Sequence, residues 1–415
     1  MRVEIRPSKA HGTVTAPPSK SMAHRLLICA GLAQGESVVR NLAMSEDIKA
    51  TIACLRSLGA EIQLDGDTAY VKGTDVTKPT GRIAVLPCNE SGSTLRFFIP
   101  LCLLSGEERV LTGSEYLMKR PLSVYEQIAA KQGVRFERSA DRVTVKGKLN
   151  RGVYDVPGNI SSQFISGLLF ALPFLDGSSQ ICVVPPLESC SYINMTVDAL
   201  KTFGISVMHG FYQLDDCFFW MIPRGAEYAP ADVTVEGDYS NAAFFEALNY
   251  AGADVKVDGL REDSLQSDKI YKILFEKIKH SEIAAINGID ISGCPDLGPV
   301  LFAAAALCSG GRFTGTRRLK IKESDRANAM KQELEKVGVR MDVKENDVTV
   351  YPGKLHAPDE PIDSHNDHRI VMAMSVLLTV TGGVIEGAEA VKKSFPDFFD
   401  RLKDLGVDLT YGMDQ

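Results

Sequence analysis

Cationic side chains stand at the starts of several helical stretches of this chain, where their charge opposes the positive end of the helix dipole. Lys20 and Arg25 open one stretch, and Arg96, Arg326 and Arg369 lie in the first turns of three others. One such arginine is usually an ordinary surface charge. Four helix starts of this kind suggest a bound polyanion that reverses the sign of the local field. Helix N-termini and arginines together suit phosphate and carboxylate groups.

Two carboxylates accompany these cations. Asp296 directly precedes the apolar run 300–307, and Glu323 lies between Lys322 and Arg326. Asp296 could simply cap a helix, and Glu323 could simply pair with its basic neighbours. A carboxylate among lysines and arginines can also be tuned for proton transfer when a substrate closes over it. The residues alone leave both interpretations open.

Further donors occur in polar loops before helices. They are Ser161, Ser162 and Gln163 at one helix start, Ser189 and Tyr192 at another, and the basic pairs Lys119–Arg120 and Lys392–Lys393. Helix capping and ordinary solvation are the simpler explanations of each group taken alone.

A repeat positions these residues. Five amphipathic stretches end in a glycine suited to the left-handed position after a helix, and a strand follows each. The glycines are Gly59, Gly133, Gly204, Gly338 and Gly406, at a period of about 70 residues with one double gap. A sixth, degenerate copy is therefore expected near residues 270–286.

A second series of helices runs in step with the first. These stretches are apolar on all sides, which is typical of buried helices. They start near Ser21, Ser93, Ser162, Ser240, Leu297 and Asp367. We expect six units, three per lobe, with helices packed inside short sheets and the midpoint of the repeat near Pro230.

Composition limits the class of protein. The chain has 415 residues, 45% hydrophobic and 24% charged, which is typical of a globular protein of two or three domains. Its net charge of −7 argues against a nucleic-acid-binding protein. The nine cysteines show no paired spacing, so free thiols in a reducing compartment are expected. The start has no signal-peptide pattern, and the longest apolar run, 164–175, is too short to span a bilayer. A cytoplasmic protein without membrane contact is expected.

Several common chemistries lack a motif. The sequence has no phosphate-binding loop with a Gly-Lys-Ser/Thr end, no dinucleotide fingerprint and no nucleophile elbow. His365 and His368 could ligate a metal, but no carboxylate or cysteine cluster completes a site. Neither a metal nor a cofactor is expected.

Eight motifs occur in one order along nearly the whole chain. They are Pro-Ser-Lys-Ser at 18–21 with Arg25, Glu-Ser-Gly-Ser-Thr-Leu-Arg at 90–96, Arg-Pro at 120–121, Ser-Ser-Gln at 161–163, Ser189 with Tyr192, Lys-Glu-Ser-Asp-Arg at 322–326, Asn-Asp-His-Arg at 366–369 and Lys-Ser-Phe-Pro-Asp at 393–397. Together they resemble the 5-enolpyruvylshikimate-3-phosphate synthase family. Each motif is weak by itself, but eight in order are specific.

The resemblance implies a fold and a division of the chain. The fold is a two-lobed inverse α/β barrel of six βαβαββ units, with buried helices inside short mixed sheets. Residues 17–230 would form the lobe that holds shikimate 3-phosphate. Residues 1–16 with 231–415 would form the lobe with the catalytic carboxylates and the phosphoenolpyruvate side. The substrates would bind in a cleft between the lobes, which would close over them, and the protein would be a monomer.

The resemblance also implies a reaction, the transfer of the enolpyruvyl group of phosphoenolpyruvate to the 5-hydroxyl of shikimate 3-phosphate by addition and elimination, without a cofactor. Asp296 would accept the hydroxyl proton, Glu323 would exchange a proton at C3, and Lys20 would assist phosphate departure. Shikimate 3-phosphate would be held by Lys20, Ser21, Arg25, Ser161, Ser162, Gln163, Ser189, Asp296 and Lys322. Phosphoenolpyruvate would be held by Lys20, Gly92, Arg120, Gln163, Arg326, Arg369 and Lys393.

The chain departs from the family pattern at Pro18, Glu90, Phe97 and Arg318, which affects the detailed substrate contacts but not the reaction class. Three alternatives fit the sequence less well. A UDP-N-acetylglucosamine enolpyruvyl transferase would carry a cysteine in the loop 113–120, which has none. An RNA 3′-phosphate cyclase would need a basic track. A non-catalytic anion-binding module would need no pair of proton-transfer carboxylates.

Overall fold

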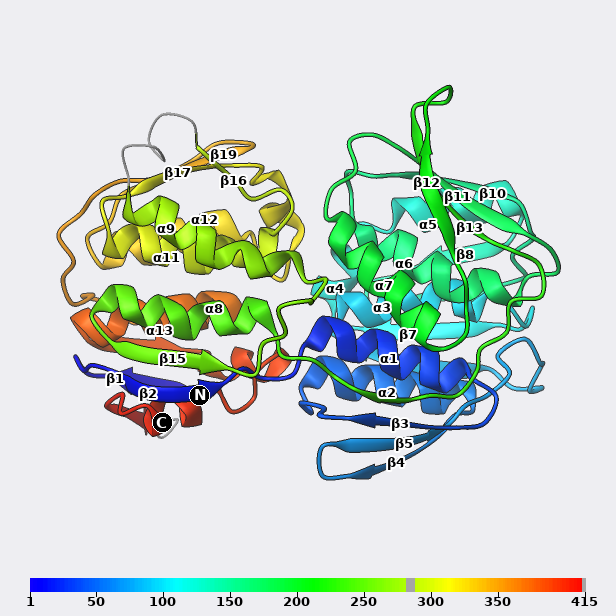
Figure 1. Cartoon of the computed structure of the whole chain (residues 1–415), viewed down its shortest axis with the longest axis horizontal. Coiled ribbons are helices and arrows are strands. Elements are labelled where there is room, and N and C mark those ends of the chain that lie inside the picture. Colours follow the sequence, from blue (N-terminus) through cyan, green and yellow to red (C-terminus); the bar gives the residue numbers. More distant parts are fainter. Residues whose placement is uncertain (281–287, 413–415) are drawn as a thin grey trace. The chain divides into compact units, whose positions relative to one another are not determined.

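The structure is a computed structural model that describes residues 1–280 and 288–412. The chain divides into two compact units. Unit 1 consists of Met1–Pro17 and Glu236–Gln415, and unit 2 consists of Pro18–Val235. The chain forms β1 (Arg2–Ile5) and β2 (His11–Thr15) of unit 1, then all of unit 2, and then returns to complete unit 1. Figure 1 traces this path by colour.

Unit 2 contains three four-stranded mixed sheets. Their strands are β3 (Glu36–Arg40), β4 (Glu61–Asp65), β5 (Thr68–Lys72), β6 (Ala84–Asn89), β7 (Arg109–Gly113), β8 (Arg135–Arg138), β9 (Arg142–Lys146), β10 (Val153–Pro157), β11 (Ser179–Val184), β12 (Met208–Tyr212), β13 (Cys217–Ile222) and β14 (Asp232–Thr234). The strand orders are β14-β3-β5-β4, β6-β7-β9-β8 and β10-β11-β13-β12. In every sheet the first pair is parallel and the other two pairs are antiparallel, so the three sheets are copies of one pattern.

Unit 1 repeats this pattern. Its further strands are β15 (Asp254–Asp258), β16 (Ile289–Asp290), β17 (Gly311–Thr314), β18 (Met341–Val343), β19 (Asp347–Val350), β20 (Ile362–Asp363), β21 (Gly383–Glu386) and β22 (Leu409–Gly412). Two sheets, β16-β17-β19-β18 and β20-β21-β1-β22, again combine one parallel pair with two antiparallel pairs. The third sheet described is the parallel pair β15-β2.

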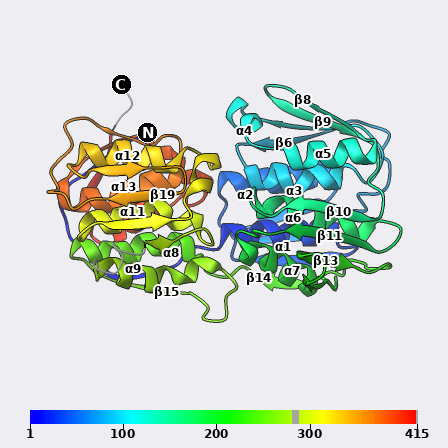
Figure 2. The same cartoon turned by 90° about the horizontal axis from the view of Figure 1, so that it is seen from above.

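Six inner helices fill the two units. They are α1 (Lys20–Leu32), α3 (Gly92–Cys102) and α6 (Ser162–Ala171) in unit 2, and α8 (Tyr239–Ala247), α11 (Gly298–Leu307) and α13 (His368–Thr381) in unit 1. Almost every residue of these helices is buried, as their uniformly apolar sequences predict. Figures 1 and 2 show each set enclosed by the strands of its own unit. None of the six has an acidic residue in its first turn, but Asp238 caps α8 and Asp367 caps α13, so it is the N-termini of α1, α3, α6 and α11 that can serve external anions.

Six amphipathic helices lie on the inner ones. They are α2 (Glu46–Leu58), α5 (Ser123–Gln132), α7 (Cys190–Thr202), α9 (Tyr271–Lys279), α12 (Arg326–Lys336) and α14 (Phe398–Asp404). The five predicted glycines all have positive φ after such a helix; for example, φ is 112° at Gly59 and 68° at Gly133. Shorter turns are α4 (Glu115–Lys119), η1 (Leu172–Phe174), η2 (Leu248–Ala251), η3 (Ser267–Ile270), η4 (Pro295–Leu297), η5 (Arg317–Ile321) and η6 (Ala388–Lys393).

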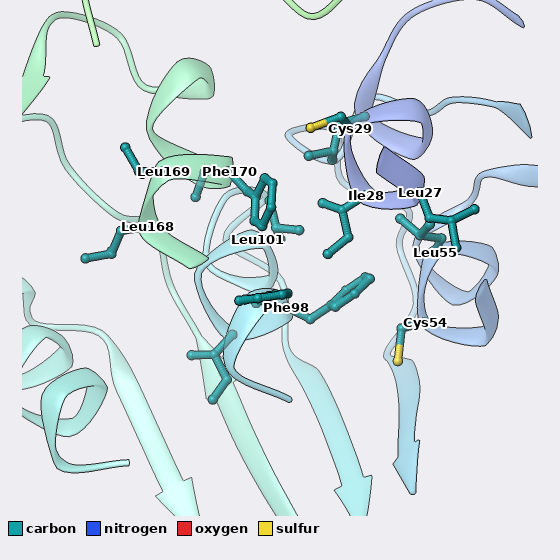
Figure 3. Close-up of a cluster of buried hydrophobic side chains, with 14 of the residues drawn as sticks. Leu27, Ile28, Cys29, Cys54, Leu55, Phe98, Leu101, Leu168, Leu169 and Phe170 are labelled. Atoms are coloured by element: carbon teal, nitrogen blue, oxygen red, sulfur yellow. The ribbon is translucent and has the colours of Figure 1, made fainter. Parts of the chain in front are cut away.

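Each unit has its own hydrophobic core. In unit 2, Phe98 of α3, Phe170 of α6 and Ile28 of α1 belong to one core, and all three side chains are fully buried (Figure 3). Full burial of one such side chain contributes about 1.5–3 kcal/mol to stability. This core fixes the inner helices and therefore the positions of their N-terminal residues.

The predicted fold class, a mixed α/β chain of repeated units with buried helices inside short sheets, is confirmed. The helix α9 begins within the segment predicted to hold the degenerate copy, and residues 281–286 of that segment lie outside the described residues. Across the described residues, no helix combines the length and hydrophobicity needed to cross a membrane.

Candidate active site

Arg326 is the centre of a charged cluster in unit 1. Its side chain is 1% exposed and lies at the start of α12. Its guanidinium donates from Nη1 to Asp296 Oδ1 (2.7 Å) and from Nη2 to Glu323 Oε2 (2.5 Å). Nε and Nη2 also donate to Asp367, at 2.9 and 3.4 Å. All three nitrogens are therefore used by the carboxylates of the chain itself.

Asp367 links this cluster to the start of α13. Its side chain is fully buried and accepts from Ser324 Oγ at 3.0 Å and from the backbone N–H of Arg369 at 2.9 Å. It is thus the N-terminal cap of α13 and the main anion of Arg326 at once. A buried carboxylate needs such partners because its desolvation is costly.

The charge of Asp296 is stabilised by three cations. Burial raises the pKa of its carboxyl group, but Lys322, Arg369 and Arg326 outweigh burial and hold the pKa well below its ordinary value. The Nζ of Lys322 lies 3.1 Å from Asp296 Oδ1. Asp296 lies in η4, and α11 has no side-chain cap, so the capping interpretation of Asp296 is wrong.

Lys322 has an unusually acidic ammonium group. Burial lowers the pKa of Lys322 to about 8, with further lowering by Arg318 and Arg326 and partial compensation by Asp296. A lysine of this kind loses its proton readily when its anionic partner leaves, and keeps it when a phosphate binds.

Arg369 offers donors for an external anion. Its side chain is 7% exposed, and its Nη2 lies 3.6 Å from Asp296 Oδ2. Within the described part of the chain, Nε and Nη1 of Arg369 have no hydrogen-bond partner. Nearby, Lys393 at the end of η6 donates from Nζ to the carbonyl of Asn366 at 2.6 Å. The two buried nitrogens of Arg369 therefore call for an acceptor that the described residues do not supply.

In unit 2, Lys20 pairs with a carboxylate that the sequence analysis missed. Its Nζ lies 2.9 Å from Oδ2 of Asp47, and both side chains are largely buried. Lys20 is the first residue of α1, and Asp47 lies in the first turn of α2. The pair fixes the lysine at the helix start, where the dipole alone would disfavour it.

Arg25 is a buried cation without a carboxylate partner among the described residues. It donates to Thr196 Oγ1 (2.8 Å) and to the carbonyls of Ser21 (2.5 Å) and Tyr192 (2.9 Å). Burial lowers the pKa of Arg25 to about 10. A charge held only by neutral acceptors favours an incoming anion.

The predicted Gly92 and Arg120 are in direct contact. A Cβ added to Gly92 would lie 2.8 Å from Cζ of Arg120, so only glycine lets this guanidinium lie over the start of α3. Beside them, Arg96 Nη1 donates to Gln163 Oε1 (2.7 Å), and Gln163 Nε2 donates to Ser93 Oγ (2.9 Å). The amide of Gln163 therefore connects the starts of α3 and α6.

The predicted serines behave differently from one another. Ser161 accepts from the backbone N–H of Gln163 at 3.3 Å, so it caps α6, which was the simpler of its two interpretations. Ser162 is buried behind it. Ser189 precedes α7 in a left-handed conformation (φ 55°) and makes no capping hydrogen bond.

Sequence reasoning missed two further acids. Asp47 gave no signal, because an acid in a first helical turn is ordinary. Asp268 of η3 is buried and accepts a hydrogen bond from Ser240, and burial together with Asp296 raises its pKa to about 6. Within the described residues no group of acids, histidines and cysteines could hold a metal ion.

The predicted site residues are divided between the two units, and those of unit 1 are joined by ion pairs around Asp296 and Arg326. Unit 1 holds Asp296, Lys322, Glu323, Arg326, Arg369 and Lys393, and unit 2 holds Lys20, Ser21, Arg25, Gly92, Arg120, Ser161, Ser162, Gln163 and Ser189. Buried cations at helix starts, together with carboxylates held among them, are typical of enzymes that perform proton transfer on small anionic substrates.

Comparison with known proteins gives the family. The profile of the EPSP synthase (3-phosphoshikimate 1-carboxyvinyltransferase) family matches residues 5–402. Curated 3-phosphoshikimate 1-carboxyvinyltransferases include that of Clostridium kluyveri, 40% identical over 427 aligned residues and 98% of each chain, and that of Clostridium novyi, 39% identical over 431 aligned residues and 97% of each chain. The chain belongs to the EPSP synthase family.

Solved structures share the fold. An EPSP synthase from Acinetobacter baumannii matches with a TM-score of 0.77 at 22% identity, over 100% of both chains. The enolpyruvyl transferase NikO from Streptomyces tendae matches with a TM-score of 0.76 at 15% identity, over 100% of this chain and 99% of that one.

Proposed function

We propose that this chain transfers the enolpyruvyl group of phosphoenolpyruvate to the 5-hydroxyl of shikimate 3-phosphate and releases phosphate, as a step of aromatic amino acid biosynthesis. Membership of the EPSP synthase family across residues 5–402 carries the proposal. The cationic side chains of both units support it, because both substrates are polyanions and the reaction needs proton transfer but no redox chemistry.

The addition step joins the two substrates. The 5-hydroxyl oxygen attacks C2 of phosphoenolpyruvate and gives its proton to Asp296, while C3 takes a proton from Glu323. In the elimination step, C3 returns a proton to Glu323 and the C2–phosphate oxygen bond breaks, with Lys20 assisting the departing phosphate. Acid–base groups of this kind contribute about 10²–10⁴ in rate.

The state of Asp296 before substrate binding supports its role as a base. Three cations hold its pKa low, so it is ionised and a weak base. When substrate anions draw Lys322 and Arg369 toward themselves, Asp296 loses that stabilisation and its basicity rises. The enzyme would therefore activate its base only when the substrates are bound.

The phosphoenolpyruvate side would consist of Lys20, Gly92, Arg120, Gln163, Arg326, Arg369 and Lys393. Since Nε and Nη1 of Arg369 have no hydrogen-bond partner among residues 1–280 and 288–412, Arg369 is favoured as the first contact. Arg326 could join only by releasing Asp296 or Glu323, because its nitrogens are all occupied.

The shikimate 3-phosphate side would consist of Lys20, Ser21, Arg25, Ser161, Ser162, Gln163, Ser189, Asp296 and Lys322. Arg25, a buried cation without an ion pair among the described residues, favours a phosphate there. Since each unit carries part of this set, the two units would close when shikimate 3-phosphate binds. Small-angle scattering with saturating ligand should show compaction, and unchanged scattering would count against closure. We expect the enzyme to be a monomer, which light scattering would check.

Phosphate release from phosphoenolpyruvate tests the proposal. Release should require shikimate 3-phosphate. Release that requires UDP-N-acetylglucosamine instead would assign the chain to the sister reaction, and no release from folded protein would indicate a binding module.

The variant Glu323→Gln tests the role at C3. It should bind shikimate 3-phosphate as the parent does, because it keeps the shape of the side chain, but it should lose turnover at least about 100-fold. Turnover within a few-fold of the parent would show that Glu323 does not exchange the C3 proton.

A further inference from the structure

The segment 364–367 connects β20 to α13 in unit 1 and has an unusual backbone. His365 and Asn366 have φ values of 48° and 52°, so two consecutive non-glycine residues adopt the left-handed conformation. Such residues are uncommon and persist only where the surrounding structure holds them in place. The contacts of this segment identify what holds it.

Two side chains of the helix α12 form hydrogen bonds at the two ends of this segment. Arg326 donates to Asp367 at the end of the segment (2.9 Å). Two helical turns further along the same face, the buried Glu333 accepts from the backbone N–H of Asp363 (3.0 Å) and from Nε2 of His365 (2.8 Å). His365 and Asp367 are therefore the two side chains of the segment through which α12 holds the left-handed turn, and the carboxylate of Asp363 also accepts from the backbone N–H of His365 at 2.7 Å.

This left-handed turn also orients two cations of the phosphoenolpyruvate side. The carbonyl of Asn366 accepts from Lys393 Nζ at 2.6 Å, and the cap residue Asp367 fixes the backbone of Arg369. Ser364 packs against Gly387, which precedes η6, and accepts from the N–H of Asn366 at 3.1 Å. A shift of the backbone at His365 would therefore reach Lys393 through the neighbouring Asn366, whose carbonyl holds the Lys393 Nζ.

We propose that His365 is a positioning residue for the phosphoenolpyruvate side: hydrogen-bonded to Glu333, it holds the left-handed turn whose Asn366 carbonyl orients Lys393. This rests on the proposed function, since it assigns the segment to that side of the site. This role also gives His365, one of the two histidines considered as metal ligands, a function that needs no metal.

The protonation of His365 makes this positioning depend on pH. The hydrogen bond to Glu333 raises the pKa of His365 above its ordinary value, although burial lowers it. The charged groups that face the imidazole are Glu333 and Lys336 of α12 and Asp363 of β20. Lys336 lies 2.7 Å from Glu333 and stays charged, so deprotonation of His365 weakens the hold on the turn without removing it.

Kinetics of three variants, from pH 6 to 9, test the proposal. His365→Asn tolerates the positive φ but is too short to reach Glu333. His365→Gln restores the reach and donates without titrating. His356→Asn is the matched control, because His356 is exposed, its imidazole hydrogen-bonds the carbonyl of Ala357, and its ring lies beside Gly338, away from the site residues.

We expect His365→Asn to raise the KM for phosphoenolpyruvate about tenfold, with kcat and the KM for shikimate 3-phosphate within about twofold of the parent. In the parent and in His356→Asn, the KM for phosphoenolpyruvate should rise with pH above 6.5. In both His365 variants that rise should be absent, and His365→Gln should recover most of the affinity. A KM for phosphoenolpyruvate within twofold of the parent in His365→Asn, or a loss confined to kcat, would overturn the proposal.

Limited acylation of the lysines gives a readout that does not depend on turnover. The ratio of Lys393 to Lys392 labelling, measured by mass spectrometry, should rise at least about threefold in His365→Asn, since a loosened Asn366 carbonyl no longer holds Nζ. An unchanged ratio would overturn the positioning role. If the parent fails to release phosphate, the proposed function is wrong, and this ratio still decides whether His365 positions Lys393.

Discussion

Replacing Arg326 with methionine should destabilise unit 1 strongly. The change removes a guanidinium that is 1% exposed and that pairs with three carboxylates. Asp296 and Glu323 are 18% and 20% exposed, so water can partly solvate them. Among the described residues, the fully buried Asp367 then keeps Ser324 Oγ and the N–H of Arg369 as hydrogen-bond partners, with Nδ1 of the buried His368 3.8 Å away. The uncompensated charge of Asp367 therefore accounts for most of the lost stability.

The magnitude follows from that burial. Removing one partner of a buried ion pair costs about 3–5 kcal/mol of unfolding free energy. For a unit of this size, each kcal/mol lowers the Tm by about 2–4 °C, so the transition of unit 1 should fall by about 10 °C. Arg326→Met combined with Asp367→Asn should regain about 2 kcal/mol, because the second change removes the stranded charge.

Urea unfolding followed by circular dichroism measures the loss. The only tryptophan of the chain, Trp220, lies in unit 2, so its fluorescence follows unit 2 separately and serves as the internal control. Neither Arg326→Met nor the double variant should show turnover, since both lack a proposed phosphoenolpyruvate contact. A loss below about 1 kcal/mol in the single variant, or a double variant no more stable than the single one, would refute the reasoning.

Two further predictions concern the substrate contacts. Gly92→Ala should raise the KM for phosphoenolpyruvate about tenfold with little change in Tm, because the added Cβ displaces the guanidinium of Arg120. The control is Gly293→Ala, where a Cβ meets no atom within 4 Å. An unchanged KM in Gly92→Ala would contradict the contact between Gly92 and Arg120. The affinity for shikimate 3-phosphate should fall about tenfold from pH 7 to 9, because Lys322, with a pKa of about 8, loses its positive charge as the pH rises. Calorimetric titration should show this fall in the parent but not in Lys322→Arg, and an equal fall in both would assign it to another group.

Much of the fold could be predicted because it depends on local pattern. Uniformly apolar stretches predicted the inner helices, and α1, α3 and α6 begin within one residue of the predicted positions. The glycines marked the ends of outer helices, since the left-handed position after a helix excludes most other residues. Cations at helix starts indicated the candidate site, because nothing in a local helix favours them there.

The partners of those cations required the tertiary structure. Lys20 pairs with a residue 27 positions away, His365 with one 32 positions away and Arg326 with one 41 positions away. The sequence spacing of such pairs has no period, because the contact depends on how two helices pack rather than on either helix.

Sequence by itself determined which elements this chain forms and which side chains stand at their ends, since those follow from side-chain periodicity and backbone sterics. Tertiary structure alone decided which charges are buried together. The state of Asp296, for instance, depends on the balance between its desolvation and the cations that three separate elements bring to it. Both quantities depend on distance and burial, and folding sets both.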